Sequence, residues 1–386
     1  MTYTIVIDAT AVHEQSGGAG TYLRALVSAL SDRGHPPIVI ARRNDLQAWM
    51  GAEEVMRIAP TRRPFRMLWE HVGLGRALAR RIPHGTVVLH SPHYTSPVSL
   101  PRRVRRVVTI HDLTFFTRPG DHSLPKRLFF TRAIRSSVGR ADAIIAVSDA
   151  TASQYLAITG RSERVFTALH GVDHTTFKPY GPADTHLMSA DATLLAEAGV
   201  VGCFVAFLGT IEPRKQVPLL LRAYGSVKSR NSDVGLVLAG QQWPGYSLPP
   251  AQPGEIRLGY VSDALAAALL RSAAVVVYPS ADEGFGLPLV EAMASGAPVV
   301  AARSQVSLEV CGDAAQLVDI DPPGQFSERL GVAIIDALDP ARREQRSQAG
   351  IQRSSQFSWD KSAAAHLLAY EAAAERAPVE QAPAGS

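Results

Sequence analysis

Cysteine is nearly absent from this sequence, in which Cys203 and Cys311 are the two cysteines among 386 residues. They are too few for a disulfide-stabilised secreted scaffold, and they supply no ligand cluster for a metal site. The sequence also lacks an apolar run of the ~20 residues that a membrane-spanning helix needs. Its opening, "MTYTIVIDA", has no signal-peptide pattern. These absences predict a protein of the reducing cytoplasm.

Charge is sparse as well, since charged residues make up 19% of the chain against 46% apolar residues, with a formal net charge of +4. This balance is typical of a packed globular protein, and we expect no nucleic-acid partner. Basic residues still gather in the first third, in "TRRPFR", "RALARR" and "PRRVRRV". They predict either a plain solvated surface or a peripheral contact with anionic lipid at the inner face of the membrane. The arginines expected to make that contact are Arg102, Arg103, Arg105 and Arg106.

The length and the order of the apolar runs predict two domains. A chain of 386 residues is too long for one ordinary core. Compact strand-like runs such as "YTIVIDA" and "GTVVLHS" alternate with helical patterns, stop at an irregular stretch and restart with "CFVAFLGT". This pattern predicts an α/β fold of two doubly wound, Rossmann-like domains with parallel sheets. The expected parts are residues 1–178, a linker over 179–200, a second domain over 201–355 and a disordered tail over 377–386.

Three glycines in "SGGAGTYL" follow the first strand and precede a helix. Glycine lets backbone amides approach an anion, and a helix N-terminus favours negative charge. Gly18 and Gly20 are therefore candidate phosphate contacts, with a plain loop as the alternative. A dinucleotide fingerprint is disfavoured because these glycines come too late after the strand.

Histidines stand at two other expected strand ends. His111 and Asp112 follow "VVTI", while His90 and His93 lie in "HSPHY". A histidine at a strand mouth can donate to a developing negative charge or move a proton. A structural, fully hydrogen-bonded histidine is an equal alternative. We expect no metal here, because the three histidines come from separate segments without zinc-ligand spacing.

The segment "LGTIEPRK" places two cations directly before a predicted helix. The preceding strand ends at Gly209 and Thr210, and Arg214 and Lys215 follow. Cations at a helix N-terminus oppose the helix dipole, so a bound anion explains them better than helix stability does. A diphosphate suits the fork of Arg214 together with the point charge of Lys215.

Two carboxylates flank a glycine-rich turn in "SADEGFGLPLVEAMASG". Glu283 precedes the turn, and Glu291 falls on the helix that follows. A carboxylate can accept hydrogen bonds from the hydroxyls of a ribose or a hexose. The amides of Phe285, Gly286 and Leu287 can donate to a phosphate. The alternative is a helix start with one acidic capping residue, which leaves the unusual turn unexplained.

These motifs, in register along nearly the whole chain, resemble glycosyltransferase family 4, which contains retaining enzymes of the GT-B fold. The segments that carry the resemblance are "PSADEGFGLPLVEAMASGAPVVAA", "EVCGDAA", "LGTIEPRK", "LGYVSDALAAALLRS", "GGAGTY", "HSPHY", "TIHDLTFF" and "HGVDHTTFKP". The resemblance implies a cleft between the two domains and a helix over 356–376 that crosses back to the first. Two positions depart from the family pattern: Gln216 replaces the usual Asn, and Ser307-Leu308 replaces Leu-Pro.

The resemblance also implies a role for each candidate residue. Glu283 would face the donor hexose and Glu291 would hold the ribose. The diphosphate would be neutralised by Arg214 and Lys215, while His111 would line the reaction centre. The implied donor contacts are Gly18, Gly20, Gly209, Thr210, Tyr260, Val261, Phe285, Gly286 and Leu287, with Tyr260 and Val261 near the base.

The implied activity is transfer of a hexose from a nucleotide-diphosphate sugar to a glycan or lipid-linked acceptor. Mannosyltransferase-like members resemble the chain most, which favours GDP-mannose as the donor, with UDP-sugars and other GDP-sugars as the alternatives. The cationic pair would replace the metal ion of other glycosyltransferases, so no metal or other cofactor is expected. The alternatives are a nucleotide-sugar epimerase of the same fold and a non-catalytic nucleotide-sugar-binding protein. A dehydrogenase is disfavoured by the displaced glycines.

Overall fold

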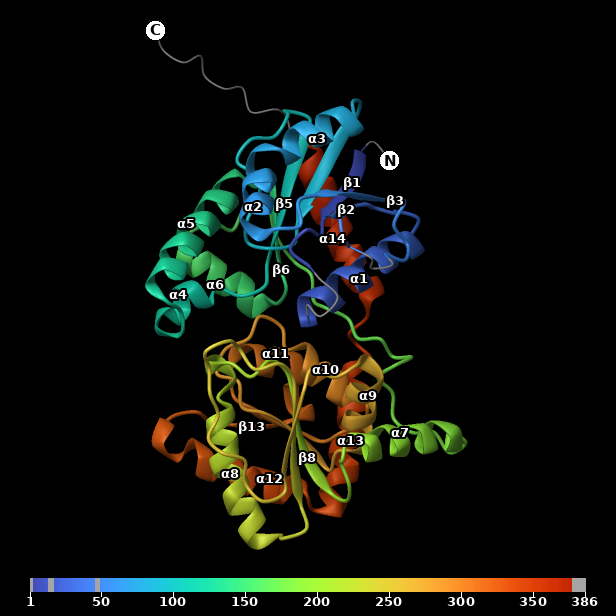
Figure 1. Cartoon of the computed structure of the whole chain (residues 1–386), viewed down its shortest axis with the longest axis vertical. Coiled ribbons are helices and arrows are strands. Elements are labelled where there is room, and N and C mark those ends of the chain that lie inside the picture. Colours follow the sequence, from blue (N-terminus) through green and yellow to red (C-terminus); the bar gives the residue numbers. More distant parts are fainter. Residues whose placement is uncertain (1–2, 13–16, 46–48, 377–386) are drawn as a thin grey trace. The chain divides into compact units, whose positions relative to one another are not determined.

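The computed structural model describes residues 3–12, 17–45 and 49–376, which form two compact units (Figure 1). Unit 1 comprises Met1–Leu169 and Trp359–Ser386, and unit 2 comprises His170–Ser358. Unit 1 is discontinuous because the C-terminal helix α14 (Trp359–Ala374), red in Figure 1, packs with the first part of the chain. Each helix in the described residues is too short or too polar to cross a bilayer.

Unit 1 contains a seven-stranded parallel sheet with the order β3-β2-β1-β4-β5-β6-β7. The chain moves outward from β1 to β3, returns beside β1 at β4 and then moves outward to β7. The order reverses between β1 and β4, so their carboxyl ends form a topological switch point. The strands are β1 (Tyr3–Asp8), β2 (Ile38–Arg42), β3 (Glu54–Ala59), β4 (Thr86–Ser91), β5 (Val104–Ile110), β6 (Ala143–Ala146) and β7 (Val165–Thr167).

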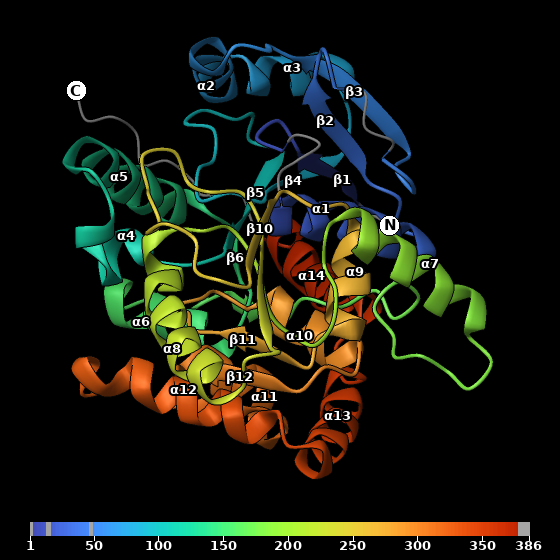
Figure 2. The ribbon, with the colours of Figure 1, turned by 60° about the horizontal axis from the view of Figure 1, so that its bottom comes forward.

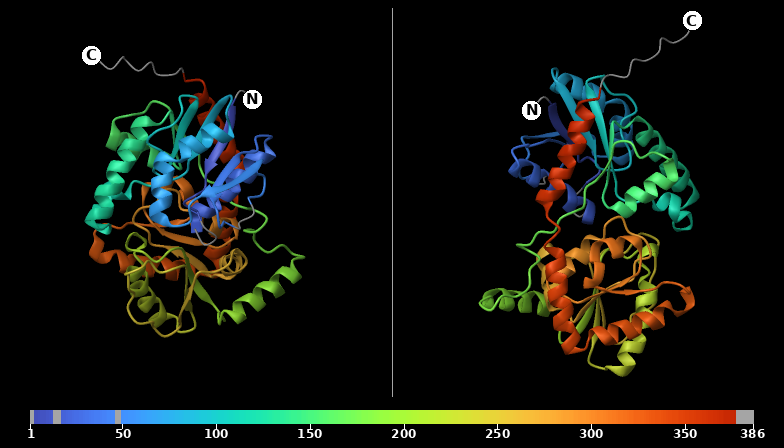
Figure 3. Two further views of the ribbon diagram at one scale, coloured as in Figure 1. Left: turned by 45° about the horizontal axis from the view of Figure 1, so that its top comes forward. Right: turned by 180° about the vertical axis from the view of Figure 1, so that it is seen from behind.

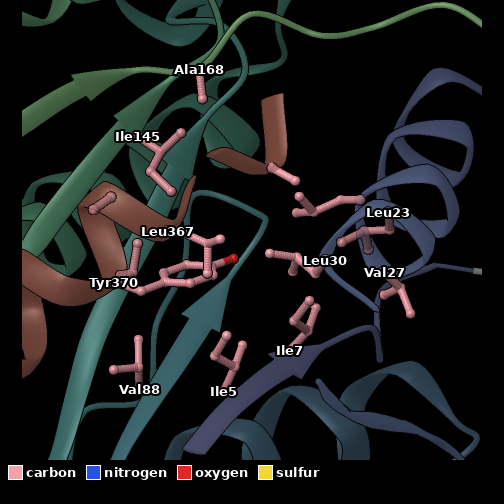
Figure 4. Close-up of a cluster of buried hydrophobic side chains, with 14 of the residues drawn as sticks. Ile5, Ile7, Leu23, Val27, Leu30, Val88, Ile145, Ala168, Leu367 and Tyr370 are labelled. Atoms are coloured by element: carbon pink, nitrogen blue, oxygen red, sulfur yellow. The ribbon is translucent and has the colours of Figure 1, made fainter. Parts of the chain in front are cut away.

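Helices cover both faces of this sheet because its strands are apolar on both faces. On one face, Leu30 and Leu367 pack over Ile5 and Ile7 (Figure 4). These leucines come from α1 (Gly17–Asp32) and α14, and Figure 3 shows α14 running along the strands. Residues of α3 and α5 pack on the opposite face. The remaining helices of unit 1 are α2 (Arg63–Val72), α3 (Leu74–Arg81), α4 (Thr114–Thr117), η1 (Pro119–Asp121), α5 (Leu124–Arg140) and α6 (Asp149–Thr159).

A chain of hydrogen bonds runs beneath α14, and its direction follows from the chemistry of its members. Nδ1 of His366 lies 2.7 Å from the carbonyl oxygen of Ser362, which can only accept, so Nδ1 carries a proton. In the neutral ring Nε2 must accept, and the Tyr22 hydroxyl donates to it at 2.8 Å. Burial lowers the pKa of His366 to about 4, which keeps this ring neutral at pH 7.

The chain continues through Thr109 to His90. The Tyr22 hydroxyl, having donated its proton, accepts from Oγ1 of Thr109 at 3.2 Å. Thr109 therefore accepts from Nε2 of His90 at 2.7 Å. Nδ1 of His90 then accepts from the Tyr370 hydroxyl at 2.8 Å. These bonds fix α14 to α1, β4 and β5 with donors and acceptors alternating in one direction.

Unit 2 contains a six-stranded parallel sheet with the order β10-β9-β8-β11-β12-β13, which reverses between β8 and β11. Gly331 lets α12 approach α8, because a Cβ there would lie 3.3 Å from the carbonyl oxygen of Ala223; Figure 2 shows the two helices side by side. The strands are β8 (Phe204–Leu208), β9 (Gly235–Ala239), β10 (Glu255–Gly259), β11 (Val275–Tyr278), β12 (Val299–Ala302) and β13 (Gln316–Val318). The helices are α7 (Thr185–Glu197), η2 (Pro213–Lys215), α8 (Val217–Arg230), α9 (Asp263–Ser272), α10 (Leu287–Ala294), α11 (Gln305–Cys311), η3 (Gly312–Ala314), η4 (Pro323–Gln325), α12 (Phe326–Ala337) and α13 (Pro340–Ser354).

The segment 179–200, expected as a linker, is part of unit 2 and carries α7. A buried bidentate ion pair holds it there: Arg271 of α9 contacts Asp191 of α7 at 2.7 Å and 3.1 Å. The Tyr180 hydroxyl also donates to Asp191 at 2.8 Å. The mixed polarity of this segment, which suggested a linker, arises because polar side chains attach α7 to α9. The expected disordered tail, 377–386, lies outside the described residues.

The arginine run expected to contact anionic lipid lies partly within β5, which contains Arg105 and Arg106 but begins after Arg103. Arg102 is exposed, but Arg103, Arg105 and Arg106 are only partly exposed. Guanidinium groups of Arg103 and Arg106 donate to backbone carbonyls, including that of Val98 at 3.3 Å from Arg106. These arginines therefore differ in exposure, since Arg105 and Arg106 belong to a strand, and their contact with anionic lipid stays a prediction.

Acid should destabilise unit 1. In an unfolded chain a histidine titrates near pH 6.5, as a rule of thumb, whereas the folded pKa of His366 is about 4. The unfolded state therefore binds more protons between these values. The free energy of unfolding should fall as the pH drops below about 6.5, by up to roughly 3 kcal/mol from this residue.

Urea unfolding between pH 7 and pH 4.5 measures this effect. His366→Gln should flatten the pH dependence, since glutamine does not titrate. His186→Gln, at an exposed position of α7, should leave it unchanged. An equal pH dependence of the free energy of unfolding in the wild type and in His366→Gln would contradict the assignment.

Candidate active site

Three neighbouring strands of unit 2 end in glycines with positive φ. Gly209, Gly240 and Gly259 follow or end β8, β9 and β10, with φ of 149°, 141° and 66°. The amide of Gly240 donates to the Gly259 carbonyl at 2.6 Å. A Cβ on Gly240 would lie 2.0 Å from the carbonyl oxygen of Gly209, so no larger residue fits. Gly240 is not among the site residues predicted from the sequence. The same pattern, a strand-like run that ends in glycine, precedes both Gly209 ("FLG") and Gly240 ("VLAG").

A buried ion pair lies at the switch point between β8 and β11. Nζ of Lys215, a residue 5% exposed at the end of η2, contacts Oε1 of Glu283 and the hydroxyl of Tyr278. The Ser280 hydroxyl donates to the same carboxylate oxygen. Tyr278 is the last residue of β11, and Glu283 stands in the loop that follows. The structure thus brings together Lys215 and Glu283, two predicted site residues, and adds Tyr278 and Ser280.

Arg214 belongs to the same cluster but is more exposed than Lys215. Its guanidinium contacts Glu283 and Glu212, each at 2.7 Å, and donates to the carbonyl of Asp282 at 2.9 Å. The two cations therefore already have carboxylate counterions in the folded chain. The sequence predicts two cations that await an anion and gives no sign of Glu212, because this pairing depends on folding. An incoming anion would meet a preorganised network rather than two isolated charges.

The cluster stays ionised despite its burial. Burial opposes ionisation of Glu283, but the charges of Arg214 and Lys215 outweigh it and lower the pKa of that carboxyl to about 2. Burial lowers the pKa of Lys215 to about 8, while Glu283 acts in the opposite direction. At neutral pH the pair is a carboxylate and an ammonium, so it presents fixed charge at the strand ends.

The turn before α10 uses glycine for a backbone reason. Gly286 has a φ of +83°, and a Cβ there would lie 2.9 Å from Leu289. The Phe285 side chain is buried, with its ring 5.0 Å from that of His170, so only its backbone can serve a ligand. Leu287 begins α10, and no side chain caps this helix start. The amides of this turn remain the part of the segment suited to an anion.

Glu291 has a different electrostatic environment from Glu283. It lies on α10 and is partly exposed. Burial raises the pKa of its carboxyl to about 7, and the negative charge of Asp263 adds to this effect. Asp263 begins α9, which follows Tyr260 and Val261 beyond β10; Tyr260 is 47% exposed. Near neutral pH, Glu291 can therefore accept or donate in hydrogen bonds with hydroxyl groups.

In unit 1, His111 directly follows β5 and has a defined tautomer. Its Nε2 lies 2.8 Å from the carbonyl oxygen of Pro92 and must donate to it. Burial lowers the pKa of His111, so the ring is neutral with Nδ1 as an acceptor. The Tyr22 ring meets it edge-on at 5.0 Å, and the His93 ring lies 6.3 Å away. His111 and His93 are thus brought together at the carboxyl edge of the sheet.

Two expectations about unit 1 need correction. His90 was a candidate to line a site with His111, but it is fully buried and bonded to Thr109 and Tyr370 through both ring nitrogens. Gly18 and Gly20 were expected in a loop before a helix, and they instead form part of the first turn of α1. Gly18 is exposed there and Gly20 is buried. A strand end was recognisable in the sequence, but the direction of the His90 side chain was not.

The two departures from the family pattern lie at a turn and at a helix start. Gln216 adopts a left-handed conformation with φ of +50° between η2 and α8, where Asn is favoured over Gln. Ser307 completes a capping box with Ser304 at the start of α11, in which each side chain bonds the other's backbone amide. Both residues shape the backbone and contribute no charge. Among the described residues, no group of three or more His, Cys, Asp or Glu is placed to hold a metal ion.

Comparisons with known proteins match both units. Residues 16–176 match the family described as Glycosyltransferase Family 4, and residues 202–336 match Glycosyl transferases group 1. The chain is 31% identical over 295 residues to O-antigen chain mannosyltransferase B of Escherichia coli, with 74% of each chain covered. It is 29% identical over 334 residues to a D-inositol 3-phosphate glycosyltransferase of Thermobifida fusca, covering 77% of this chain and 72% of the relative.

Among solved structures, Alr3699/HepE of Anabaena in complex with UDP and glucose is similar, with a TM-score of 0.68 and 20% identity. The match covers 95% of this chain and 99% of that one. The predicted fold is confirmed: two parallel-sheet, Rossmann-like domains of the GT-B type.

Proposed function

The chain belongs to glycosyltransferase family 4, and from that premise we propose that it moves mannose from GDP-mannose to a glycan or lipid-linked acceptor. The observation that carries the proposal is the charged cluster of Lys215, Arg214 and Glu283 at the switch point of unit 2. Ligands of open parallel sheets bind at such points. The choice of mannose is supported by the relative named O-antigen chain mannosyltransferase B.

The donor diphosphate would bind at the cationic cluster. Departure of a nucleoside diphosphate places negative charge on its oxygens, and Arg214 and Lys215 supply fixed positive charge nearby. Glu283 and Tyr278 already hold Lys215 in place, so little reorganisation is needed when that charge develops. The amides of residues 285–287 would donate to phosphate oxygens, and the exposed turn at Tyr260 and Val261 would contact the base.

Glu291 would hold the ribose hydroxyls and Glu283 would face the hexose. In the transfer, the bond from the anomeric carbon to the diphosphate breaks and a bond to the acceptor oxygen forms. The acceptor proton passes to the departing diphosphate, and the family resemblance implies retention of configuration. His111 would take part on the side of unit 1 as a neutral hydrogen-bonding group, with Gly18 and Gly20 assisting at the diphosphate.

Transfer should proceed without a divalent metal, because the cationic cluster neutralises the leaving group. The measurement is mannosyl transfer from GDP-mannose in the presence of EDTA, alongside a thermal-shift panel of other nucleotide sugars. Complete loss of wild-type activity in EDTA, restored by magnesium or manganese, would contradict the charge argument. Nucleotide-sugar binding without transfer would favour a non-catalytic protein, and release of a free sugar epimer would favour an epimerase.

Lys215→Ala should reduce the stabilisation of the transition state by roughly 2–4 kcal/mol, the range for one preorganised donor. The ratio of kcat/KM between the wild type and this variant measures the loss.

Replacing Glu291 and replacing Glu283 should change different kinetic constants. Glu291→Gln should mainly raise the donor KM, because ribose contacts are equal in the ground and transition states. Glu283→Gln should mainly lower kcat. The carboxylate stabilises the positive charge that develops on the sugar, and this stabilisation is larger in the transition state than in the ground state. Steady-state kinetics of both variants decide this, with Glu344→Gln on α13 as an exposed control. The roles are reversed if Glu283→Gln changes only KM while Glu291→Gln abolishes kcat.

We further propose that the protein works in the cytoplasm and contacts the inner face of the membrane through α5. This helix exposes Leu124, Leu128 and Phe129, by 68%, 51% and 43%. Exposed cations on the same helix are Lys126, Arg127, Arg132 and Arg135. An exposed apolar and basic helix surface suits an anionic interface.

Replacing Leu128 and Phe129 together by Ser should reduce co-sedimentation with phosphatidylglycerol vesicles. Val332→Ser, an equally exposed change on α12, should not. Equal sedimentation of the wild type with neutral and anionic vesicles would remove the membrane proposal.

A further inference from the structure

Two polar residues lie side by side at the switch point of unit 1. β1 ends at Asp8 and β4 ends at Ser91, and the register that pairs Ile7 with His90 places these two residues next to each other. Alternation along a strand puts their side chains on the face where Val6 and Leu89 pack against α3. This is the carboxyl edge at which open parallel sheets bind ligands.

Helix α2 adds a second carboxyl to this place. Glu70 accepts from the Thr10 hydroxyl at 2.5 Å, and the Thr10 amide donates to Asp8 at 3.0 Å. Arg66 contacts Glu70 at 3.0 Å and donates to the Thr10 carbonyl at 2.6 Å. The side chain of Glu70 is 13% exposed and Asp8 is 9% exposed. Thr10 thus links two nearly buried carboxyls across the end of the sheet.

Ionisation of both Asp8 and Glu70 is unfavourable at this place. Burial raises the pKa of Asp8, and it raises the pKa of Glu70 to about 7, with the charge of Asp8 adding to the latter effect. Two carboxyls placed together at low exposure oppose each other's ionisation. Such arrangements gather at functional sites, since an apolar pair would be simpler for stability alone.

An independent observation points to a ligand at this edge. The Ser91 hydroxyl is buried, in a residue 2% exposed, and has no hydrogen-bond partner among the described residues. Nε2 of His93, two positions further on, is buried and likewise lacks a partner there. Buried polar atoms are nearly always hydrogen-bonded in native proteins. A hydroxyl-bearing ligand would supply the missing bonds to Ser91 and accept or donate at the two carboxyls.

We propose that Asp8, Glu70 and Ser91 form the subsite for hydroxyl groups of the acceptor, and that the acceptor group bound there is an uncharged sugar. This inference rests on the proposed glycosyl transfer. The subsite selects against a phosphate because its two carboxyls would repel one. Two cations also lie near these carboxyls: Arg66 contacts Glu70 and donates to the Thr10 carbonyl, and Arg42 donates to the Val12 carbonyl at 2.5 Å.

Kinetics with a matched pair of acceptors test the proposal. The probes are methyl α-D-mannoside and its 6-phosphate, assayed with GDP-mannose or with the donor that the thermal-shift panel selects. The wild type should use the neutral mannoside and discriminate against the phosphate. Ser91→Ala and Glu70→Gln should each raise the KM for the neutral acceptor on the order of tenfold, the effect of one lost hydrogen bond. Donor KM and donor hydrolysis to free sugar should stay at the wild-type level.

Ser362→Ala is the control, since Ser362 is also a buried serine whose hydroxyl lacks a partner among the described residues. It lies on α14, which packs on the other sheet face, and its acceptor KM should not change. Thermal unfolding of each variant shows whether it folds. The subsite is refuted if folded Ser91→Ala and Glu70→Gln leave the acceptor KM unchanged. It is also refuted if they impair donor hydrolysis as much as they impair use of the acceptor, or if the 6-phosphate is the better acceptor. Absence of any transfer or donor hydrolysis by the wild type would instead refute the glycosyltransferase proposal and this subsite with it.

Discussion

The buried pair of Lys215 and Glu283 constrains the whole candidate site of unit 2. An ammonium with 5% exposure is tolerable only beside a carboxylate, and that carboxylate needs further donors to stay ionised. Arg214 and Ser280 supply them, and Glu212 in turn balances Arg214. The loops after β8 and β11 must therefore close on one another. Their shared charge network fixes the geometry of the cluster in the folded chain, which is the preorganisation that the proposed electrostatic catalysis requires.

In unit 1, the neighbouring residues His90 and Ser91 of β4 differ in their hydrogen bonding. His90 points into the core, where Thr109 and Tyr370 satisfy both of its ring nitrogens. Ser91 points to the other face at the strand end and finds no partner among the described residues. Alternation along the strand explains the difference. The core network fixes α14 to the sheet, whereas the edge that carries Ser91 is where we propose that a ligand binds.

The fold was predictable because its signals are local. Strand-like runs, helical spacing and glycines after strands each occupy a few consecutive residues, and they gave two parallel-sheet domains. The sequence also predicted Lys215 and Glu283 as site residues, but it did not indicate that they form an ion pair with each other. It placed a linker where Asp191 docks α7 onto α9, because the Arg271 counterion lies 80 positions further along the chain. It gave no sign of Asp8, Glu70 and Ser91, the residues of the proposed acceptor subsite, since single polar residues carry no distinctive pattern.

The sequence by itself determined the α/β class, the places where strands end and the family, because periodicity and motifs are read from adjacent residues. Only the tertiary structure decided which charges neutralise each other and which histidines are structural. Lys215 meets Glu283 across 68 positions, and Tyr22 meets His366 across 344. Such pairs form when strands far apart in the chain are brought to one sheet edge or one core. Burial there also sets the pKa values, and no spacing in the sequence encodes that burial.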